Sequence, residues 1–260
     1  MKLLLKKGIG ILSGVVTFVL ILSLVALFSY TLVDYFSSSE SAVSEDYDVS
    51  SGGLLRAALI DALYVTHPNV NFTRSLEETL GGVGFQVDVY QGEEVTVEFL
   101  KKLVSGYSLI VLRMHSALSS RNELYLFTSE PYSSGKYVYE QSYGLAKKAF
   151  ATDPSQPVFA VNWGFIKKLM TGKFDGALVI AMGCDGALDP FIAQEFLNQG
   201  AVGYIAWNGP VLLAHSDETI LHLVRALYIE RLSMEEAVSK INYEIGEDPH
   251  WGTFLDCYIP

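Results

Sequence analysis

The chain has 260 residues, 50% of them hydrophobic, a mean hydropathy of +0.28 and a formal net charge of −11 at pH 7. This hydropathy is too high for a wholly soluble protein, so part of the chain is expected to lie in a membrane. The acidic balance and the lack of a basic patch argue against nucleic acid as a partner, because nothing would attract its phosphates.

The apolar excess lies at the N-terminus. Residues 8–33 carry no charged side chain and exceed the ~20 residues that a transmembrane helix needs. A secretory signal peptide is the alternative, but its apolar core is usually about 7–15 residues long, so we expect a retained anchor. Lysines in the basic tail 1–7 predict a cytoplasmic N-terminus and a domain outside the cell membrane. Residues 34–53, rich in Ser, Gly and acidic side chains, predict a flexible stalk.

The rest of the chain, 54–260, has the size of one domain and alternates strand and helix patterns. The patterns predict strands at 56–65, 85–90, 107–116, 158–161, 177–186, 201–207 and 253–259. Between them they predict helices at 71–80, 95–104, 188–198, 215–231 and 233–245, and a helical turn at 164–170. This order predicts an α/β fold with a mostly parallel sheet flanked by helices.

An insertion at 118–157 interrupts the alternation. It is rich in tyrosine and predicts a hairpin with a short helix. Long insertions at the rim of a sheet often carry a binding function. The alternative is that the aromatic side chains close a small core of the insertion itself, since most aromatic residues are used for packing.

Two of the predicted strands end in reactive side chains, Cys184 and His115. The carboxyl ends of parallel strands form the rim at which ligands bind, so a thiol and an imidazole would face one crevice if these strands are neighbours. That is the minimum arrangement for a cysteine hydrolase. The alternatives are a packed thiol, a buried histidine, and a disulfide between Cys184 and Cys257.

The order of these features is similar to a known group of enzymes. A strand ending in His115 precedes a strand ending in Cys184, and a helix and the run NQGAVGYIAWNGPV (198–211) follow. This order resembles the caspase–hemoglobinase fold of clan CD cysteine peptidases, which include caspases, gingipains, clostripain, legumain, separase and CHAT domains. The resemblance covers about residues 56–237 and is closest to the CHAT and gingipain versions. Two positions depart from it: Ser116 replaces the usual Gly after the histidine, and Gly183 replaces the common Ala before the cysteine.

The resemblance implies a role for each residue of the dyad. Cys184 would be the nucleophile, and His115 would give a proton to the leaving amine. Backbone N–H groups near Gly183 and Ser116 are candidates for an oxyanion hole, where donors aimed at the developing charge stabilise it. In the resembling fold a further strand separates Cys184 from Cys257, which argues against the disulfide, because two strand spacings of ~4.8 Å exceed its limit of ~6.8 Å between Cα atoms.

The resemblance also suggests substrate-binding residues. Trp207 and Asn208 follow the next strand and are expected to line the same rim. Asp185, Asp189 and Asp217 are acids that would meet a basic substrate side chain, or else cap helices and face solvent.

The sequence therefore predicts an outward-facing, membrane-anchored cysteine peptidase that acts on a peptide or protein substrate. The alternative is a catalytically silent module of the same fold that binds peptides or protein partners at the cell surface. No His/Cys/acid cluster has metal-ligand spacing, so neither a metal nor a cofactor is expected.

Overall fold

The structure is a computed structural model that describes residues 55–151 and 155–260. The predicted basic tail (1–7), transmembrane helix (8–33) and stalk (34–53) lie outside these residues, and their prediction stays open. Among the helices that are described, none is long and apolar enough to span a bilayer.

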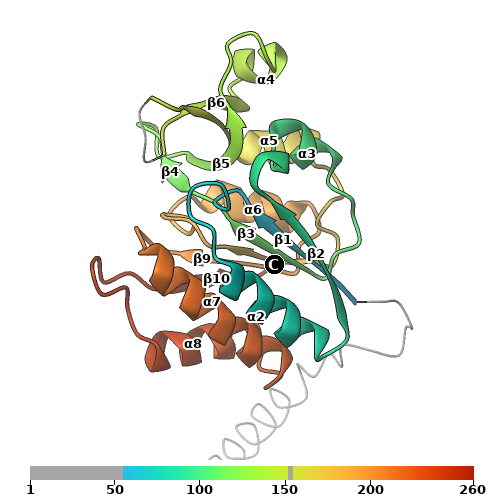
Figure 1. Cartoon of the computed structure of the whole chain (residues 1–260), viewed down its shortest axis with the longest axis vertical. Coiled ribbons are helices and arrows are strands. Elements are labelled where there is room, and N and C mark those ends of the chain that lie inside the picture. Colours follow the sequence, from blue (N-terminus) through green and yellow to red (C-terminus); the bar gives the residue numbers. More distant parts are fainter. Residues whose placement is uncertain (1–54, 152–154) are drawn as a thin grey trace, which may run out of the picture. The chain divides into compact units, whose positions relative to one another are not determined.

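A six-stranded sheet forms the centre of the domain (Figure 1). Its strands are β1 (Leu55–Asp61), β2 (Phe85–Gln91), β3 (Leu109–Arg113), β8 (Leu178–Ala181), β9 (Gly203–Trp207) and β10 (Leu255–Tyr258). They lie in the order β10-β9-β8-β3-β1-β2, and every pair is parallel except β10 with β9. The predicted mostly parallel sheet is confirmed, and the antiparallel β10 makes it a mixed sheet.

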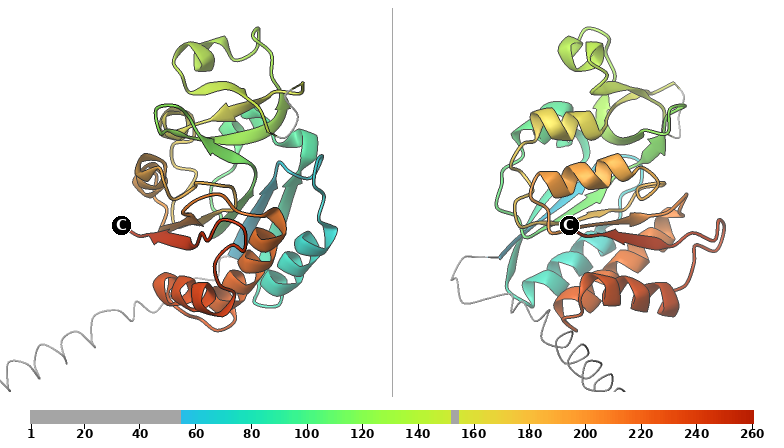
Figure 2. Two further views of the ribbon diagram at one scale, coloured as in Figure 1. Left: turned by 90° about the vertical axis from the view of Figure 1, so that its left-hand side faces the viewer. Right: turned by 180° about the vertical axis from the view of Figure 1, so that it is seen from behind.

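Helices cover both faces of this sheet, as Figures 1 and 2 show. One face packs on α2 (Val70–Gly81), α7 (Leu213–Tyr228) and α8 (Met234–Glu244); the other packs on α3 (Val97–Lys102), α5 (Trp163–Leu169) and α6 (Pro190–Asn198). A single 3₁₀ turn, η1 (Gly92–Glu94), precedes α3. The α/β fold class expected from the sequence is therefore correct for the described domain.

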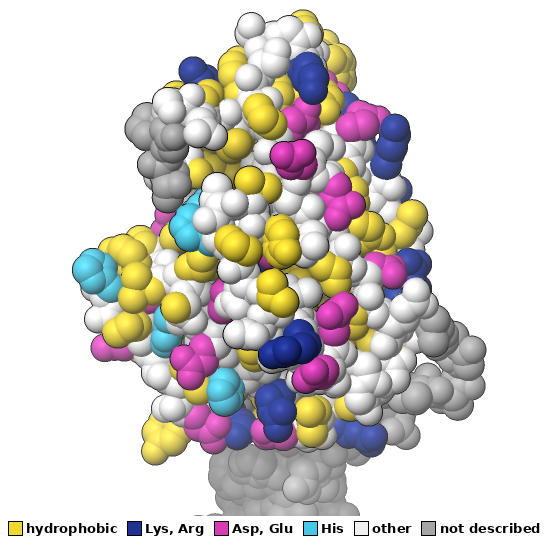
Figure 3. Space-filling model, viewed as in Figure 1, with side chains coloured by type: hydrophobic (Ala, Val, Ile, Leu, Met, Phe, Trp, Pro, Cys, Tyr) yellow, Lys and Arg dark blue, Asp and Glu magenta, His cyan; other side chains and the backbone are white. Residues whose placement is uncertain are grey.

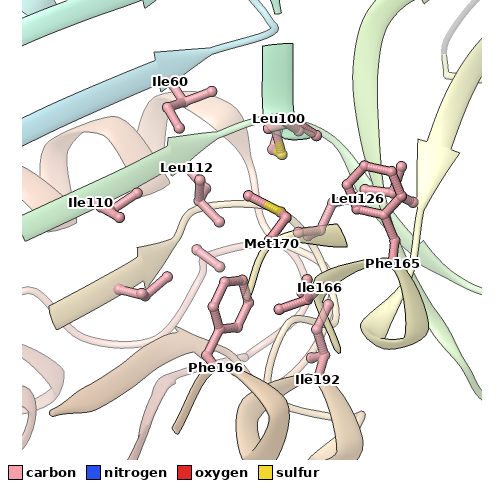
Figure 4. Close-up of a cluster of buried hydrophobic side chains, with 14 of the residues drawn as sticks. Ile60, Leu100, Ile110, Leu112, Leu126, Phe165, Ile166, Met170, Ile192 and Phe196 are labelled. Carbon is pink, nitrogen blue, oxygen red and sulfur yellow. The ribbon is translucent and has the colours of Figure 1, made fainter. Parts of the chain in front are cut away.

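The core is divided by the sheet into two clusters because side chains alternate along each strand. Figure 4 shows part of the cluster beneath α3, α5 and α6, where Ile110 and Leu112 of β3 meet Phe165, Met170 and Phe196. The central strands β3, β8 and β9 are buried at every position, which explains why they read as continuous apolar runs rather than alternating ones.

The helix ends follow local side-chain chemistry. Asp189 caps α6 by accepting a hydrogen bond from Phe191 N, with Pro190 at the first helical position. Ser233 caps α8 in a capping box with Glu236. Both starts are readable from sequence, because Asp-Pro and Ser-x-x-Glu satisfy the otherwise unpaired N–H groups of a first turn.

The insertion is larger than the predicted hairpin. It folds as a second, antiparallel sheet, β4 (Ser116–Leu118), β5 (Leu124–Pro131), β7 (Val158–Val161) and β6 (Ala146–Ala149), with α4 (Val138–Ser142) between β5 and β6. This sheet lies above the main one in Figure 1. Tyr125 and Phe127 close a small cluster of their own with Ala149 and Ala160. The packing alternative therefore holds for these two aromatic residues.

The connections leave the sheet in opposite directions at one point. The chain passes from β1 through α2 on one face, and from β3 through the insertion to α5 on the other. Because β1 and β3 are neighbours, the crevice beyond their carboxyl ends is a topological switch point, the usual ligand-binding position of an open α/β sheet.

Candidate functional site

The two reactive residues follow neighbouring strands in matching register. Leu112 of β3 is the Cα partner of Ala181 of β8, and His115 and Cys184 each stand three residues further on. Alternation places both side chains on the face covered by α2 and α7: Cys184 packs against that cluster together with Met182, whereas Met114 belongs to the opposite cluster. The structure thus brings the two residues to one rim and one face, as the sequence predicted only conditionally.

The two turns that carry these residues are joined to each other. Ser116 Oγ donates a 2.5 Å hydrogen bond to the carbonyl oxygen of Cys184. A Cβ added to Gly183 would lie 2.2 Å from Ser116 Oγ and 2.5 Å from Met114 O, which no real contact allows. Gly183 is therefore the residue that lets the Ser116 hydroxyl cross between the strands.

The turn after β8 is strained at the residue following the cysteine. Asp185 has φ 61°, in the left-handed region that side chains other than Gly, Asn and Asp rarely adopt. Its N–H donates to Gly209 O, and its carbonyl accepts from Leu188 N. Strained backbone of this kind collects at functional sites, and here it ends the strand abruptly and presents Cys184 at the rim.

The Cys184 thiol lies against the backbone of Val211. Val211 N–H donates to Sγ at 3.5 Å, and Sγ lies 3.8 Å from Val211 O. Burial raises the pKa of the Cys184 thiol above its ordinary value. The Val211 N–H opposes this in part, and the charges of Asp185 and Asp248 raise the pKa further. The thiol is therefore protonated at neutral pH in the resting protein.

His115 is the second half-buried member. Its ring lies edge-on to His67, with centroids 6.0 Å apart and planes at 90°, and 6.4 Å from the ring of Phe127. Its Nε2 is buried without a hydrogen-bond partner among the described residues. Burial lowers the pKa of His115, and the charges of His67 and Arg113 lower it further. The imidazole is thus neutral near pH 7, with an unpaired nitrogen.

A buried ion network lies directly beneath His115. Arg113 is 0% exposed and donates from Nη1 to Asp61, from Nε and Nη2 to Asp217, and from Nη1 to the carbonyl of His67, at 2.8 to 3.1 Å. Asn69 Nδ2 adds a 2.8 Å bond to Asp217. Two carboxylates share one guanidinium, so the network joins the ends of β1 and β3 to the first turns of α7.

The predicted oxyanion donors differ in what the structure shows of them. Within residues 55–151 and 155–260, the backbone N–H groups of Gly183 and Cys184 make no backbone hydrogen bond to another residue, although the Cys184 N–H lies against its own sulfur. The donor predicted at Ser116 is its backbone N–H, at the start of β4; the Ser116 hydroxyl is a separate group that donates to the Cys184 carbonyl. The prediction of an oxyanion hole itself remains open.

Most of the predicted substrate-binding side chains make structural hydrogen bonds instead. Trp207 is 1% exposed, and its indole N–H donates to Ser216 Oγ beneath α7, so it does not line the rim as expected. The amide of Asn208 accepts a hydrogen bond from Phe254 N and fixes β9 to β10. Asp189 caps α6, and Asp217 pairs with Arg113. Only the Asp185 carboxylate makes no hydrogen bond with another described residue, and burial raises its pKa.

Three residues of the site escaped the sequence analysis: His67, Asp61 and Arg113. A signal for two of them was present, because Asp61 and Arg113 are opposite charges that end two neighbouring, mostly apolar strands. The sequence held no signal for His67, because its approach to His115 depends on the path of the loop between β1 and α2.

The other predictions concern cysteines and metals. Cys184 and Cys257 are both free, and β9 lies between their strands, so the structure has no disulfide between them. Within the described part of the chain, no group of three His, Cys, Asp or Glu side chains is arranged to hold a metal ion.

Comparison with known proteins adds no relative. No protein-family model matches the chain, and the search of curated proteins finds no significant match. The arguments about function therefore rest on the residues and their geometry.

Proposed function

We propose that the domain is a cysteine peptidase, with Cys184 as nucleophile and His115 as general base and acid. The observation that carries the proposal is the register: a thiol and an imidazole with an unpaired nitrogen follow paired positions of adjacent parallel strands, on one face, beside a topological switch point. The resemblance to clan CD peptidases supports the same pair.

The departures from the family pattern are consistent with this proposal. Gly183 and Ser116 replace the usual Ala and Gly, and they are in contact, with the Ser116 hydroxyl in the place that a Cβ of residue 183 would take. In the family pattern the small side chain belongs to the residue before the cysteine, whereas here it belongs to the residue after the histidine. The two replacements therefore compensate for each other, and neither removes the thiol or the imidazole.

The reaction starts from a neutral pair. When a peptide binds, His115 accepts the proton of Sγ, and the sulfur forms a bond to the carbonyl carbon, whose oxygen the N–H groups of Gly183 and Cys184 receive. The C–N bond then breaks, and the protonated imidazole gives its proton to the leaving amine. Water, deprotonated by His115, hydrolyses the thioester and releases the acid, and the proton held by the imidazole returns to the sulfur.

Asp185 supports a preference for a basic substrate side chain. It follows the nucleophile directly, its carboxylate is half-buried, and no described side chain pairs with it. A half-buried carboxylate without a partner gains from a Lys or Arg of the substrate.

The silent binding module remains a second candidate because of one observation. Sγ makes its hydrogen bonds with the Val211 backbone and none with His115, and its pKa is raised rather than lowered. A thiol of that kind reacts slowly unless a substrate changes its surroundings. Anchoring by residues 8–33, with the domain outside the cell, belongs to either proposal.

The test uses full-length protein in detergent and peptidyl acyloxymethyl ketones that carry Lys, Arg, Leu or Asp next to the reactive ketone. Mass spectrometry identifies the modified cysteine, with Cys257 as the internal control. We expect labelling of Cys184, fastest with Lys or Arg, and its loss in Cys184→Ala and His115→Ala. No labelling of Cys184 by any of the four, in protein that iodoacetamide modifies only slowly, would refute the peptidase and favour the binding module.

A further inference from the structure

A second histidine stands at the switch point. His67 lies on the loop that leaves β1, and His115 lies on the turn that leaves β3, so the two rings face each other where the connections diverge. The 90° angle between their planes at 6.0 Å is an edge-to-face contact, a geometry that aromatic rings favour and that fixes their relative orientation.

The loop that carries His67 is held rigidly from below. The His67 carbonyl accepts a hydrogen bond from buried Arg113, and Leu63 N donates to Asp61 Oδ1. At its other end Asn69 bonds Asp217 through its amide nitrogen and caps α2 through its oxygen. The ring itself is oriented by a 3.0 Å contact of Nδ1 with Thr66 Oγ1. Hydrogen bonds therefore fix the backbone at His67 and on both sides of it, and the Thr66 contact and the ring of His115 position the side chain.

We propose that His67 is a positioning residue of the site, which holds the ring of His115 against the switch-point crevice by edge-to-face contact. The proposal rests on the proposed function and extends it, because a general base must keep its nitrogen within reach of the proton that it accepts. His115 has no carboxylate partner among the described residues, so ring contacts from His67 and Phe127 take over the task of orienting it.

The charged and titratable groups around His115 come from each packed element. His67 faces it from the β1–α2 loop, and Arg113 faces it from its own strand, balanced by Asp61 of β1 and Asp217 of α7. Cys184 lies on the turn after β8, the strand that pairs with β3, and the ring of Phe127 contacts His115 from β5. Of these titratable groups, His67 is the one whose ring contacts the ring of His115.

The experiment compares His67→Ala with His67→Phe in the full-length protein. Phe keeps a flat ring at this position and removes the nitrogen atoms and the charge. Two measurements are made on each variant: the rate of Cys184 labelling by the fastest peptidyl ketone, and the titration of His115 by NMR of ¹³Cε1-labelled histidine, assigned with His115→Ala among the five histidines of the chain.

We expect His67→Ala to lower the labelling rate about tenfold, since small misplacements of a catalytic group are costly, and to raise the titration midpoint of His115. His67→Phe should return the rate to within about threefold of the wild type. An unchanged His115 titration in His67→Ala would overturn the proposal, as would equal labelling rates in the Ala and Phe variants. If the peptidyl ketones do not label the wild-type protein, the peptidase proposal fails by itself, and the NMR titration still decides the contact between the two histidines.

Discussion

The Arg113 network allows a prediction of stability that needs no assumption about function. Replacing Arg113 by Met removes every hydrogen bond of the guanidinium and leaves two buried carboxylates, Asp61 at 0% exposure and Asp217 at 5%. Each keeps a single donor, Leu63 N and Asn69 Nδ2 respectively. Removing one partner of a buried ion pair costs about 3–5 kcal/mol, so we expect a loss of this size in the free energy of unfolding.

Arg56 provides the matched control. It lies on β1 and is also paired with a carboxylate, Asp88 of the neighbouring β2, but the side chains of Arg56 and Asp88 are 32% and 22% exposed. Arg56→Met should therefore cost about 1 kcal/mol or less, since solvent screens exposed pairs. Removing the stranded charges as well, in Arg113→Met with Asp61→Asn and Asp217→Asn, should recover about 2 kcal/mol of the loss.

The pH dependence of the stability loss in Arg113→Met provides a second test of the same reasoning. Burial already raises the pKa of Asp61 in the folded protein, against the effect of Arg113, and removing the arginine raises it further. A carboxyl whose folded pKa exceeds its unfolded value of ~3.9 favours folding below that pH and loses this contribution as pH rises through the folded pKa. The penalty of Arg113→Met should therefore be smaller at pH 4 than at pH 7.

Urea unfolding followed by tryptophan fluorescence measures these differences, with Trp207 as a buried reporter beneath α7. A penalty below 1 kcal/mol at pH 7, equal to that of Arg56→Met, would contradict the reasoning. It would show that water or a rearranged loop reaches the two carboxylates at no cost.

Three further predictions concern the two turns and the thiol. Gly183→Ala should lower stability by about 1–3 kcal/mol, and Ser116→Gly should recover part of this because it removes the atom 2.2 Å from the added Cβ; strictly additive effects in a urea double-mutant cycle would rule out the contact. In a Cys257→Ser background, the rate of Cys184 alkylation by iodoacetamide should reach half its maximum at a pH above the ordinary thiol pKa of ~8.5. Asp185→Asn or Asp248→Asn should lower that midpoint pH, because each removes a negative charge that disfavours the thiolate. A midpoint below pH ~8.5 in the Cys257→Ser parent would contradict this. Trp207→Phe should cost about 1 kcal/mol for its hydrogen bond to Ser216 and leave the peptidyl-ketone specificity of Cys184 unchanged, whereas a changed specificity would return Trp207 to the substrate pocket.

The sequence predicted the fold class well because its strongest signals are local. Continuous apolar runs identified β3, β8 and β9, and capping residues identified the starts of α6 and α8. The strand boundaries were less accurate. The first strand ends at Asp61 rather than at 65, because the carboxylate of Asp61 accepts Leu63 N and turns the chain. The same carboxylate pairs with Arg113, a residue 52 positions away, and no local pattern contains that pairing.

The candidate site also depends on features that no local sequence pattern contains. Cys184 and His115 were predictable as strand ends, but their shared face depends on the parity of two strands and on the order in the sheet. Trp207 illustrates the converse. Its position at the end of a strand suggested the rim, yet its side chain has the parity of Ile205, which lies in the core beneath α7. A strand end fixes the height of a residue in the sheet, and the alternation fixes which of the two core clusters its side chain faces; whether the side chain is buried there depends on the helix that covers it.

The protonation states of Cys184 and His115 explain why the thiol would react slowly when no substrate is bound. Burial raises the pKa of Cys184 and lowers that of His115, so both groups rest neutral, and the thiolate–imidazolium pair is the disfavoured form. A substrate that places a positive charge beside Asp185 would weaken one of the charges that hold the thiol protonated. The expected preference for Lys or Arg and the expected slow alkylation of the free protein are thus two consequences of one carboxylate. Asp185→Asn should therefore speed alkylation and at the same time reduce the preference for Lys and Arg ketones over Leu. If Asp185→Asn speeds alkylation and leaves that preference intact, Asp185 acts on the thiol alone, and the basic side chain of the substrate is recognised elsewhere.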